Sequence, residues 1–235
     1  MKQILISLIL IAQCFAETEN GSKFDCRIPD NRDWQKGWTE QHKALNAIAK
    51  KGDTDLVFIG DSIMQAWSTK GAAVWKTYYG KYKAANFGID GDQTQHVLWR
   101  IENGNFDGIK PKLIVIMIGT NNTSSSTPGE VGQALEGIVK RLQKKVPNTH
   151  LLLLGILPRG VKASSKAREH NKKANAAISK LADNKKVHFM DIGEKFLEKD
   201  GSLSKTIMPD ALHPNAKGYE IWAKAIEAKV TELMK

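Results

Sequence analysis

The stretch L-I-V-I-M-I at residues 113–118 is followed at once by G-T-N-N at residues 119–122. A continuous apolar run of this length is typical of a buried strand, and the lack of alternation indicates that both faces of the strand are covered. Strands covered on both faces occur mainly in parallel sheets that have helices on each side. The stretch therefore predicts an α/β protein with a polar cluster directly after the strand.

Short apolar runs and helical patterns alternate along the rest of the chain. The other runs are Leu56–Ile59, Lys83–Phe87, Leu151–Leu154 with a continuation to Ile156 and Leu157, and Val187–Met190. The helical patterns cover part of 34–50, then Gln93–Ile101, Pro128–Lys145, Ser164–Leu181 and Ala216–Met234. This alternation implies a central, mostly parallel sheet of about five strands with right-handed crossovers. We expect one three-layer α/β/α sandwich over residues 34–235.

The N-terminal residues are typical of a secretory signal peptide. Lys2 precedes an apolar run at residues 4–12, and the small residue Ala16 closes the segment. The run is too short to span a bilayer as a stable helix. We therefore expect residues 1–16 to be cleaved, residues 17–33 to form a polar leader, and the protein to be secreted or periplasmic without membrane insertion. An uncleaved anchor is the alternative.

Cleavage would leave Cys26 as the single cysteine of the chain. A single cysteine excludes an internal disulfide and leaves an intermolecular bridge open. The formal charge of +10 raises the question of nucleic-acid binding, but no binding motif accompanies it. The lysines come as scattered pairs at element ends and on polar helix faces, at 50–51, 144–145, 172–173 and 185–186. We interpret them as a solvated surface and expect no nucleic-acid partner.

Four polar clusters mark the expected position of the functional site. In open α/β sheets, sites lie beyond the carboxyl ends of the strands. Three clusters directly follow predicted strands, and the fourth precedes the last helix. They are G-D-S-I at 60–63, N-F-G-I-D-G-D at 86–92, G-T-N-N at 119–122 and D-A-L-H-P at 210–214. Each alone is also typical of a turn or a helix cap, but together they indicate one site.

The residue types in these clusters suit acyl transfer. The hydroxyl of Ser62 is a poor nucleophile without a base, and His213 is the candidate base. Asp210 lies three residues before His213, so one turn can bring its carboxylate to the ring and fix the tautomer. The developing oxyanion needs fixed donors, which the backbone N–H groups of Ser62 and Gly88 and the side-chain amide of Asn121 would supply. Gly88 would allow close approach of a substrate oxygen because it lacks a Cβ.

Other side chains near these clusters have simpler interpretations. His96, early in the helix after the second cluster, could reach the site. Trp67 and Trp75 follow Ser62 on the next helix, and we expect them to pack in the core rather than against substrate. The sequence carries no histidine and cysteine spacing typical of zinc. We therefore expect no zinc site.

The clusters also carry a family resemblance. The chain resembles the SGNH (GDSL-type) hydrolases and, within them, the catalytic subunits of platelet-activating-factor acetylhydrolase and their bacterial relatives. The resemblance covers about residues 53–235. Its longest stretches are F-I-G-D-S-I (58–63), N-F-G-I-D-G-D-Q-T-Q-H-V-L-W-R-I-E-N-G (86–104), K-P-K-L-I-V-I-M-I-G-T-N-N (110–122), L-L-G-I-L-P-R-G (153–160) and D-A-L-H-P-N-A-K-G-Y (210–219).

The resemblance implies a flavodoxin-like SGNH fold and the same roles for Ser62, His213 and Asp210, with Ser62, Gly88 and Asn121 as oxyanion donors. It implies no metal and no organic cofactor, and it leaves a homodimer open, because the animal relatives form dimers. Asp90 departs from the usual glycine of N-F-G-I-G-G-D and adds negative charge near the mouth of the site. The signal peptide departs from the cytosolic animal enzymes.

These departures shift the expected substrate away from platelet-activating factor. We expect a secreted esterase that removes a short acyl group, most simply acetyl, from a carbohydrate or a small molecule. A lysophospholipase, lipase or thioesterase for longer acyl chains is one alternative. A glycan-binding module that keeps the fold without catalysis is another.

Overall fold

The computed structural model describes residues 25–235, and their strands form one sheet in which every neighbouring pair is parallel. The strand order is β2-β1-β3-β4-β5. The strands are β1 (Leu56–Gly60), β2 (Ala84–Gly88), β3 (Leu113–Met117), β4 (His150–Leu154) and β5 (Val187–Met190). The predicted strands and the parallel sheet are confirmed. The order reverses between β1 and β3, which is the position at which doubly wound sheets place their ligands.

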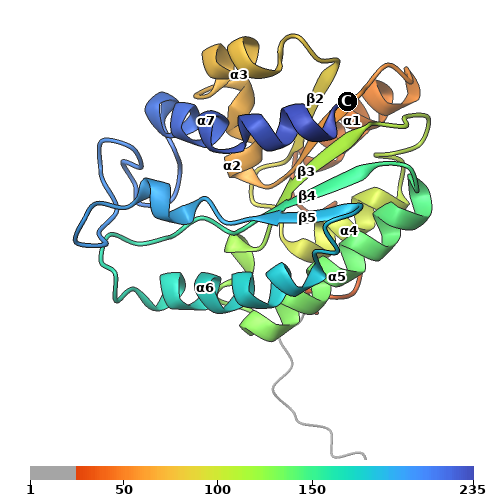
Figure 1. Ribbon diagram of the computed structural model, residues 1–235. Coiled ribbons are helices and arrows are strands. Elements are labelled where there is room, and N and C mark those ends of the chain that lie inside the picture. Colours follow the sequence, from red (N-terminus) through yellow and green to blue (C-terminus); the bar gives the residue numbers. More distant parts are fainter. Residues whose placement is uncertain (1–24) are drawn as a thin grey trace, which may run out of the picture.

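Helices cover both faces of the sheet and give the three layers expected from the sequence. In Figure 1, α4, α5 and α6 lie on one face, and α3 and α7 lie on the other. The α-helices are α1 (Trp38–Lys50), α2 (Ser62–Gln65), α3 (Ala72–Tyr79), α4 (Thr94–Glu102), α5 (Pro128–Lys145), α6 (Lys166–Ile178) and α7 (Ala216–Leu233). The 3₁₀ helices are η1 (Ala66–Ser68), η2 (Thr120–Asn122), η3 (Ser179–Leu181) and η4 (Gly193–Phe196).

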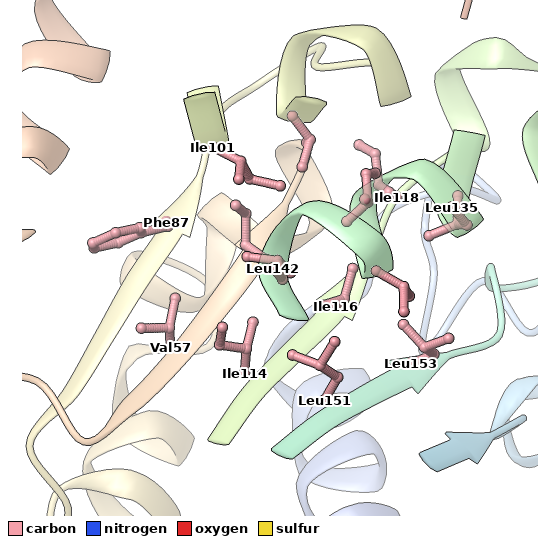
Figure 2. Packing of buried hydrophobic residues seen from close by; sticks show 14 of the residues in the cluster. Val57, Phe87, Ile101, Ile114, Ile116, Ile118, Leu135, Leu142, Leu151 and Leu153 are labelled. Carbon is pink, nitrogen blue, oxygen red and sulfur yellow. The ribbon is translucent and has the colours of Figure 1, made fainter. Parts of the chain in front are cut away.

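Each face of the sheet has its own hydrophobic core. Alternate strand residues such as Ile114, Ile116 and Leu153 point toward α4 and α5, where they meet Leu135 and Leu142 (Figure 2). The residues between them face α3 and α7. That second core is rich in aromatic rings, which pack at centroid distances of 4.5–6.1 Å: Phe58, Trp67, Trp75, Tyr79, Tyr219 and Trp222. The prediction that Trp67 and Trp75 belong to the core is therefore confirmed.

The predicted elements differ from the structure in two places. The helix expected after Ser62 is divided into α2, η1 and α3. The apolar run of β4 was expected to continue to Leu157, but the strand ends at Leu154. Beyond that point the side chain of Asn175 takes the place of a neighbouring strand, because its amide accepts from the Ile156 N–H at 2.8 Å and donates to the Ile156 carbonyl at 3.0 Å.

The N-terminal residues of the described chain pack against the domain. Cys26 is 2 % exposed, and its carbonyl accepts from the Thr94 hydroxyl on α4 at 2.8 Å. A buried thiol is not placed for the intermolecular bridge that the sequence left open. The expected signal peptide, residues 1–16, lies outside the described residues. Within residues 25–235, no helix combines the length and the apolar character that a bilayer crossing requires.

Candidate active site

The nucleophile candidate Ser62 begins α2, directly beyond the carboxyl end of β1. The side chain of Asp61 accepts from the Ile63 N–H at 2.9 Å and so caps this short helix. Gly60 makes the turn possible, because a Cβ at this position would lie 2.1 Å from the carbonyl oxygen of Met117 on β3. The candidate nucleophile is therefore held beyond the carboxyl end of β1 by a glycine that packs closely against β3.

The structure brings Ser62, His213 and Asp210 into one chain of hydrogen bonds. Ser62 Oγ lies 2.9 Å from His213 Nε2, and His213 Nδ1 lies 2.7 Å from Asp210 Oδ2. The hydroxyl and the carboxylate thus contact opposite nitrogens of the ring, as a general base and its orienting acceptor require. Ser62 and His213 are half-buried, so substrate and water can reach them.

The carboxylate of Asp210 is held in its ionised form. Partial burial raises its pKa, but hydrogen bonds from the His213 backbone N–H, the His213 ring and the Leu212 N–H outweigh burial and bring the pKa to about 2. The two backbone donors lie 2.7 and 3.0 Å from Oδ1. Asp61, the acid next to the nucleophile, takes no part in this chain. Its carboxyl is fully buried behind α2.

The candidate oxyanion donors lie at or just beyond the carboxyl ends of three neighbouring strands, β1, β2 and β3. The backbone N–H of Ser62 is at the start of α2, where N–H groups have no partner within the helix. Asn121 lies in η2, and its Nδ2 donates to the Asp92 carbonyl at 2.9 Å. A side-chain amide has two N–H groups, so this bond orients Asn121 and leaves the second one for an oxyanion. Gln93 Nε2 adds a bond to the Asn121 carbonyl at 2.7 Å.

Gly88 has a structural reason to be glycine that the sequence did not reveal. A Cβ at this position would lie 2.2 Å from the Gln65 nitrogen and 2.6 Å from the Met64 carbonyl carbon. The glycine is therefore needed for the end of β2 to pack on the backbone of α2, whether or not a substrate oxygen also approaches it. Its N–H donates to Asn86 Oδ1 at 2.9 Å and would have to be shared with an oxyanion.

His96, which the sequence allowed as an additional site residue, is buried beside Asp92. Its Nδ1 accepts from the Gln93 N–H at 2.8 Å and closes a capping box on α4. Burial lowers the pKa of His96 to about 3, and the positive charges of Arg32 and Arg100 act in the same direction. A ring that is neutral and committed to a helix cap is not placed to act as a base in the site.

Asp92 and Arg100 form a buried ion pair behind the candidate site, to which the sequence assigned no role. Arg100 Nε lies 2.9 Å from Asp92 Oδ2, and both side chains are 0 % exposed. Burial raises the pKa of the Asp92 carboxyl and lowers that of the Arg100 guanidinium, while their mutual attraction opposes both shifts. Asp92 was visible in the strand-end cluster 86–92, but nothing in the helical pattern of 93–101 distinguishes a buried arginine from an exposed one.

A cavity of about 500 Å³ lies apart from these residues, beyond β4 and β5 and beside α6. None of the five candidate site residues lines it. Its walls include Ile156, Pro158, Arg168, Asn171, Asp191 and Leu197. The candidate site beyond β1, β2 and β3 is therefore separate from this cavity.

A doubly wound α/β sheet that brings a serine, a histidine and an aspartate together at its strand ends has the architecture of a serine-type hydrolase. Comparison with known proteins identifies the class further. Residues 58–221 match the model of the GDSL-like lipase/acylhydrolase family, and the chain belongs to this family. It is therefore a carboxylic ester hydrolase, and the resemblance drawn from the sequence is confirmed.

Individual relatives agree with this assignment. The chain is 36 % identical over 198 residues to the platelet-activating factor acetylhydrolase IB subunit alpha1 of Rattus norvegicus. The match covers 84 % of each of the two chains. A GDSL-like lipase from Bacteroides thetaiotaomicron shares the fold with a TM-score of 0.65 at 22 % identity, covering 82 % of this chain and 97 % of that one. An acetylxylan esterase from Geobacillus stearothermophilus gives a TM-score of 0.61 at 17 % identity, with 75 % and 94 % covered.

Proposed function

We propose that the protein is a secreted serine esterase that removes short acyl groups, acetyl above all, through an acyl-enzyme on Ser62. The observation that carries the proposal is the continuous chain from Ser62 Oγ to His213 at 2.9 Å and from His213 to Asp210 at 2.7 Å. Such an arrangement has little structural use at a half-exposed rim. It suits proton transfer from a nucleophilic hydroxyl.

The proposed reaction has two halves. In the first, His213 Nε2 takes the proton of Ser62 as Oγ attacks the ester carbonyl carbon, and Asp210 stabilises the imidazolium that forms. The oxyanion of the tetrahedral intermediate accepts from the donors of Ser62, Gly88 and Asn121. The C–O bond to the alcohol breaks, and His213 gives the alcohol its proton. In the second half, His213 removes a proton from water, and the water oxygen attacks the acyl carbon. The C–Oγ bond to Ser62 then breaks, and His213 returns the proton to Oγ, which releases the acid and restores the Ser62 hydroxyl.

The proposed substrate is an acetyl ester on a carbohydrate or a small molecule. The names of two relatives support it, since one is an acetylhydrolase subunit and another is an acetylxylan esterase. A secreted or periplasmic location rests on the sequence of residues 1–16 and favours an extracellular glycan over a cytosolic lipid. A homodimer is part of the proposal on the strength of the family resemblance alone.

Hydrolysis of p-nitrophenyl acetate by the mature protein tests the esterase proposal. We expect turnover by the wild type and loss of at least about 10³-fold in kcat for Ser62→Ala, because the nucleophile is removed. Ser179→Ala is the matched control, since that serine only caps the end of α6 through the Ala176 carbonyl. Full activity of Ser62→Ala would eliminate the nucleophile assignment. No turnover by any form would favour the glycan-binding module.

The acyl limit and the alcohol are tested separately. A series of p-nitrophenyl esters from acetyl to decanoyl distinguishes a deacetylase, whose rate falls steeply beyond propionyl, from a lipase, lysophospholipase or thioesterase. Acetylated xylan, acetylated chitin oligomers, O-acetyl sialic acids and phospholipid esters then identify the alcohol. Preference for the longest chains would reject the acetyl ester as the natural substrate.

A further inference from the structure

The buried pair of Asp92 and Arg100 has no role in the proposed proton transfers, yet it is costly to maintain. Arginine and aspartate are almost never fully buried unless they are paired, because removing each charge from water is unfavourable. Replacing such pairs by apolar residues is often neutral or stabilising. A fully buried pair so close to the site therefore suggests a functional benefit, and its contacts indicate what that benefit is.

Arg100 links the carboxyl ends of β1 and β2. Ser62 follows β1, and Gly88 is the last residue of β2. Arg100 Nη1 donates to the Phe87 carbonyl at 2.9 Å, and its Nη2 donates to the Gly60 carbonyl at 3.3 Å. Phe87 directly precedes Gly88, and Gly60 lies two residues before Ser62. One rigid guanidinium thus fixes the spacing between two of the three candidate oxyanion donors.

Asp92 fixes the third donor. Its backbone carbonyl accepts from Asn121 Nδ2 at 2.9 Å, which orients the amide. Its carboxylate is held from both sides, by Arg100 on Oδ2 and by Trp38 Nε1 on Oδ1 at 2.8 Å. Arg32 adds a contact to Oδ1 at 3.3 Å and a bond to the Asp90 carbonyl at 2.7 Å. The carbonyl that orients Asn121 thus belongs to a residue with very little freedom to move.

We propose that the Asp92–Arg100 pair positions all three oxyanion donors relative to one another, so that both residues act as positioning residues for the esterase. This inference rests on the proposed function. The planar fork of arginine reaches two carbonyls and a carboxylate from three separate nitrogens, whereas lysine carries its donors on a single nitrogen. Oxyanion stabilisation depends on donors held in place before the reaction, so a small shift of the pair affects the transition state more than substrate binding.

Kinetics of conservative variants test the proposal. For Arg100→Lys we expect kcat on p-nitrophenyl acetate to fall by about 100-fold, the loss typical of a misplacement near 1 Å, with KM within about 3-fold of the wild type. Trp38→Phe keeps a smaller aromatic ring but removes one bond to Asp92, and we expect a smaller fall in kcat. Leu142→Ala controls for lost stability, because it truncates the core near the end of α5 and should leave kcat unchanged.

Two further measurements separate positioning from a merely structural role. In the Asn121→Ala background, we expect Arg100→Lys to reduce kcat by a smaller factor than in the wild type, because one of the donors it positions is already missing. In Arg100→Ala, we expect millimolar guanidinium to restore part of kcat by occupying the vacated space. Independent effects of the two substitutions, together with no rescue, would overturn the proposal.

Failure of the positioning role and failure of the proposed esterase activity give different results in these experiments. A wild type that does not hydrolyse p-nitrophenyl acetate contradicts the esterase itself. An active wild type whose Arg100→Lys and Trp38→Phe variants keep full kcat contradicts only the positioning role. A fall in kcat of Leu142→Ala equal to that of Arg100→Lys would also overturn the positioning role, because loss of stability would then explain both.

Discussion

His213 and Asp210 contact each other twice. Oδ2 of Asp210 lies 2.7 Å from His213 Nδ1, and Oδ1 accepts the backbone N–H of the same histidine, also at 2.7 Å. Ala211, between them, has a φ of 56°, a left-handed conformation that residues other than glycine seldom adopt. The tight turn lets one carboxylate fix both the ring and the main chain of His213, so the histidine is oriented before any substrate binds.

Asp210→Asn should therefore damage catalysis far more than folding. The amide matches the carboxylate in size, but it no longer selects the tautomer with the proton on Nδ1 or stabilises the imidazolium. By analogy with other serine triads, we expect kcat to fall by about 10⁴. Steady-state kinetics on p-nitrophenyl acetate measure the effect. Asp200→Asn is the control, since Asp200 also accepts from a backbone N–H two residues on but lies away from the site.

A kcat for Asp210→Asn within about tenfold of the wild type would assign the orienting role to another group.

The pH dependence of stability offers a second check on Asp210. The pKa of Asp210 is about 2, so its carboxylate stays ionised down to that value. Because its pKa is lowered on folding from 3.8, its stabilising contribution is present above pH 4 and is lost as the pH falls through about 2. The wild type should thus lose more stability than Asp210→Asn between pH 4 and pH 2.

The location of the candidate site was predictable from the sequence, because residues that follow the strands of a parallel sheet gather at one end of that sheet. Ser62 and Asn121 follow neighbouring strands, β1 and β3, so their proximity required only the parallel sheet. His213 was harder to place, because it precedes a helix rather than following a strand. Only the need of a serine for a base connected the two, and the structure brings them to 2.9 Å. Their catalytic roles stay predictions.

What the sequence could not predict depends on packing between segments that are distant in the chain. Arg100 lies in an ordinary amphipathic pattern, and its burial depends on Asp92 and on the carbonyls of Gly60 and Phe87, which the fold brings to it. Nothing in the sequence indicated that Gly88 packs against the backbone of α2, because that contact joins the end of β2 to residues 64 and 65. The end of β4 was missed because a side chain, that of Asn175, replaces a strand there.

The adjacent residues Asn121 and Asn122 should have separable effects. Asn121→Ala removes a candidate oxyanion donor from a half-buried position, and we expect kcat to fall by about 10²–10³-fold with little change in stability. Asn122 is fully buried and accepts from the Thr94 N–H at 3.1 Å. Asn122→Ala leaves that donor unpaired, so we expect a loss of about 1–3 kcal/mol in the free energy of unfolding.

Kinetics and urea denaturation of the two variants test this separation. Each asparagine is the control for the other, because they are neighbours in η2 and have the same chemistry. Equal losses of stability with equal losses of kcat would mean that η2 responds as a unit. In that case Asn121 would not have a distinct role in stabilising the oxyanion.

Gly88→Ala should disturb the nucleophile through the backbone of α2. The added Cβ would meet Gln65 and Met64 at 2.2 and 2.6 Å, and main-chain atoms cannot move aside as a flexible side chain can. We expect α2 to shift together with Ser62, with kcat reduced at least about tenfold and stability reduced by about 1–3 kcal/mol from overpacking. Gly129→Ala is the control, because a Cβ on this exposed α5 residue meets no atom within 4 Å. It should be neutral or slightly stabilising.

Thermal unfolding and p-nitrophenyl acetate kinetics of these two glycine variants give the comparison. A Gly88→Ala enzyme with the stability of the wild type and reduced kcat would point to the oxyanion donor alone. One with full kcat would show that α2 tolerates the added methyl group, in conflict with the close contact.

Asp61 should make the protein less stable as the pH rises toward neutrality. Burial raises the pKa of its carboxyl from 3.8 to about 7, the bond from the Ile63 N–H opposes the shift, and the charges of Asp92 and Asp90 add to it. Because the Asp61 carboxyl holds its proton more tightly in the folded state than in the unfolded chain, its contribution to the free energy of unfolding is fully present below pH 4. It is lost as the pH rises to about 7.

Asp61→Asn removes this charge and keeps the oxygen that caps α2. Relative to the wild type, its free energy of unfolding should rise between pH 4 and pH 8 by at most about 4 kcal/mol, the equivalent of three pKa units. Urea denaturation across this range measures the difference. Asp61→Ala separates the effect of the charge from that of the cap. It should lose about 1 kcal/mol of stability at every pH because the cap is missing, and its free energy of unfolding should rise with pH relative to the wild type as that of Asp61→Asn does. Parallel stability curves for the wild type and Asp61→Asn would mean that Asp61 is ionised in the folded protein at no cost.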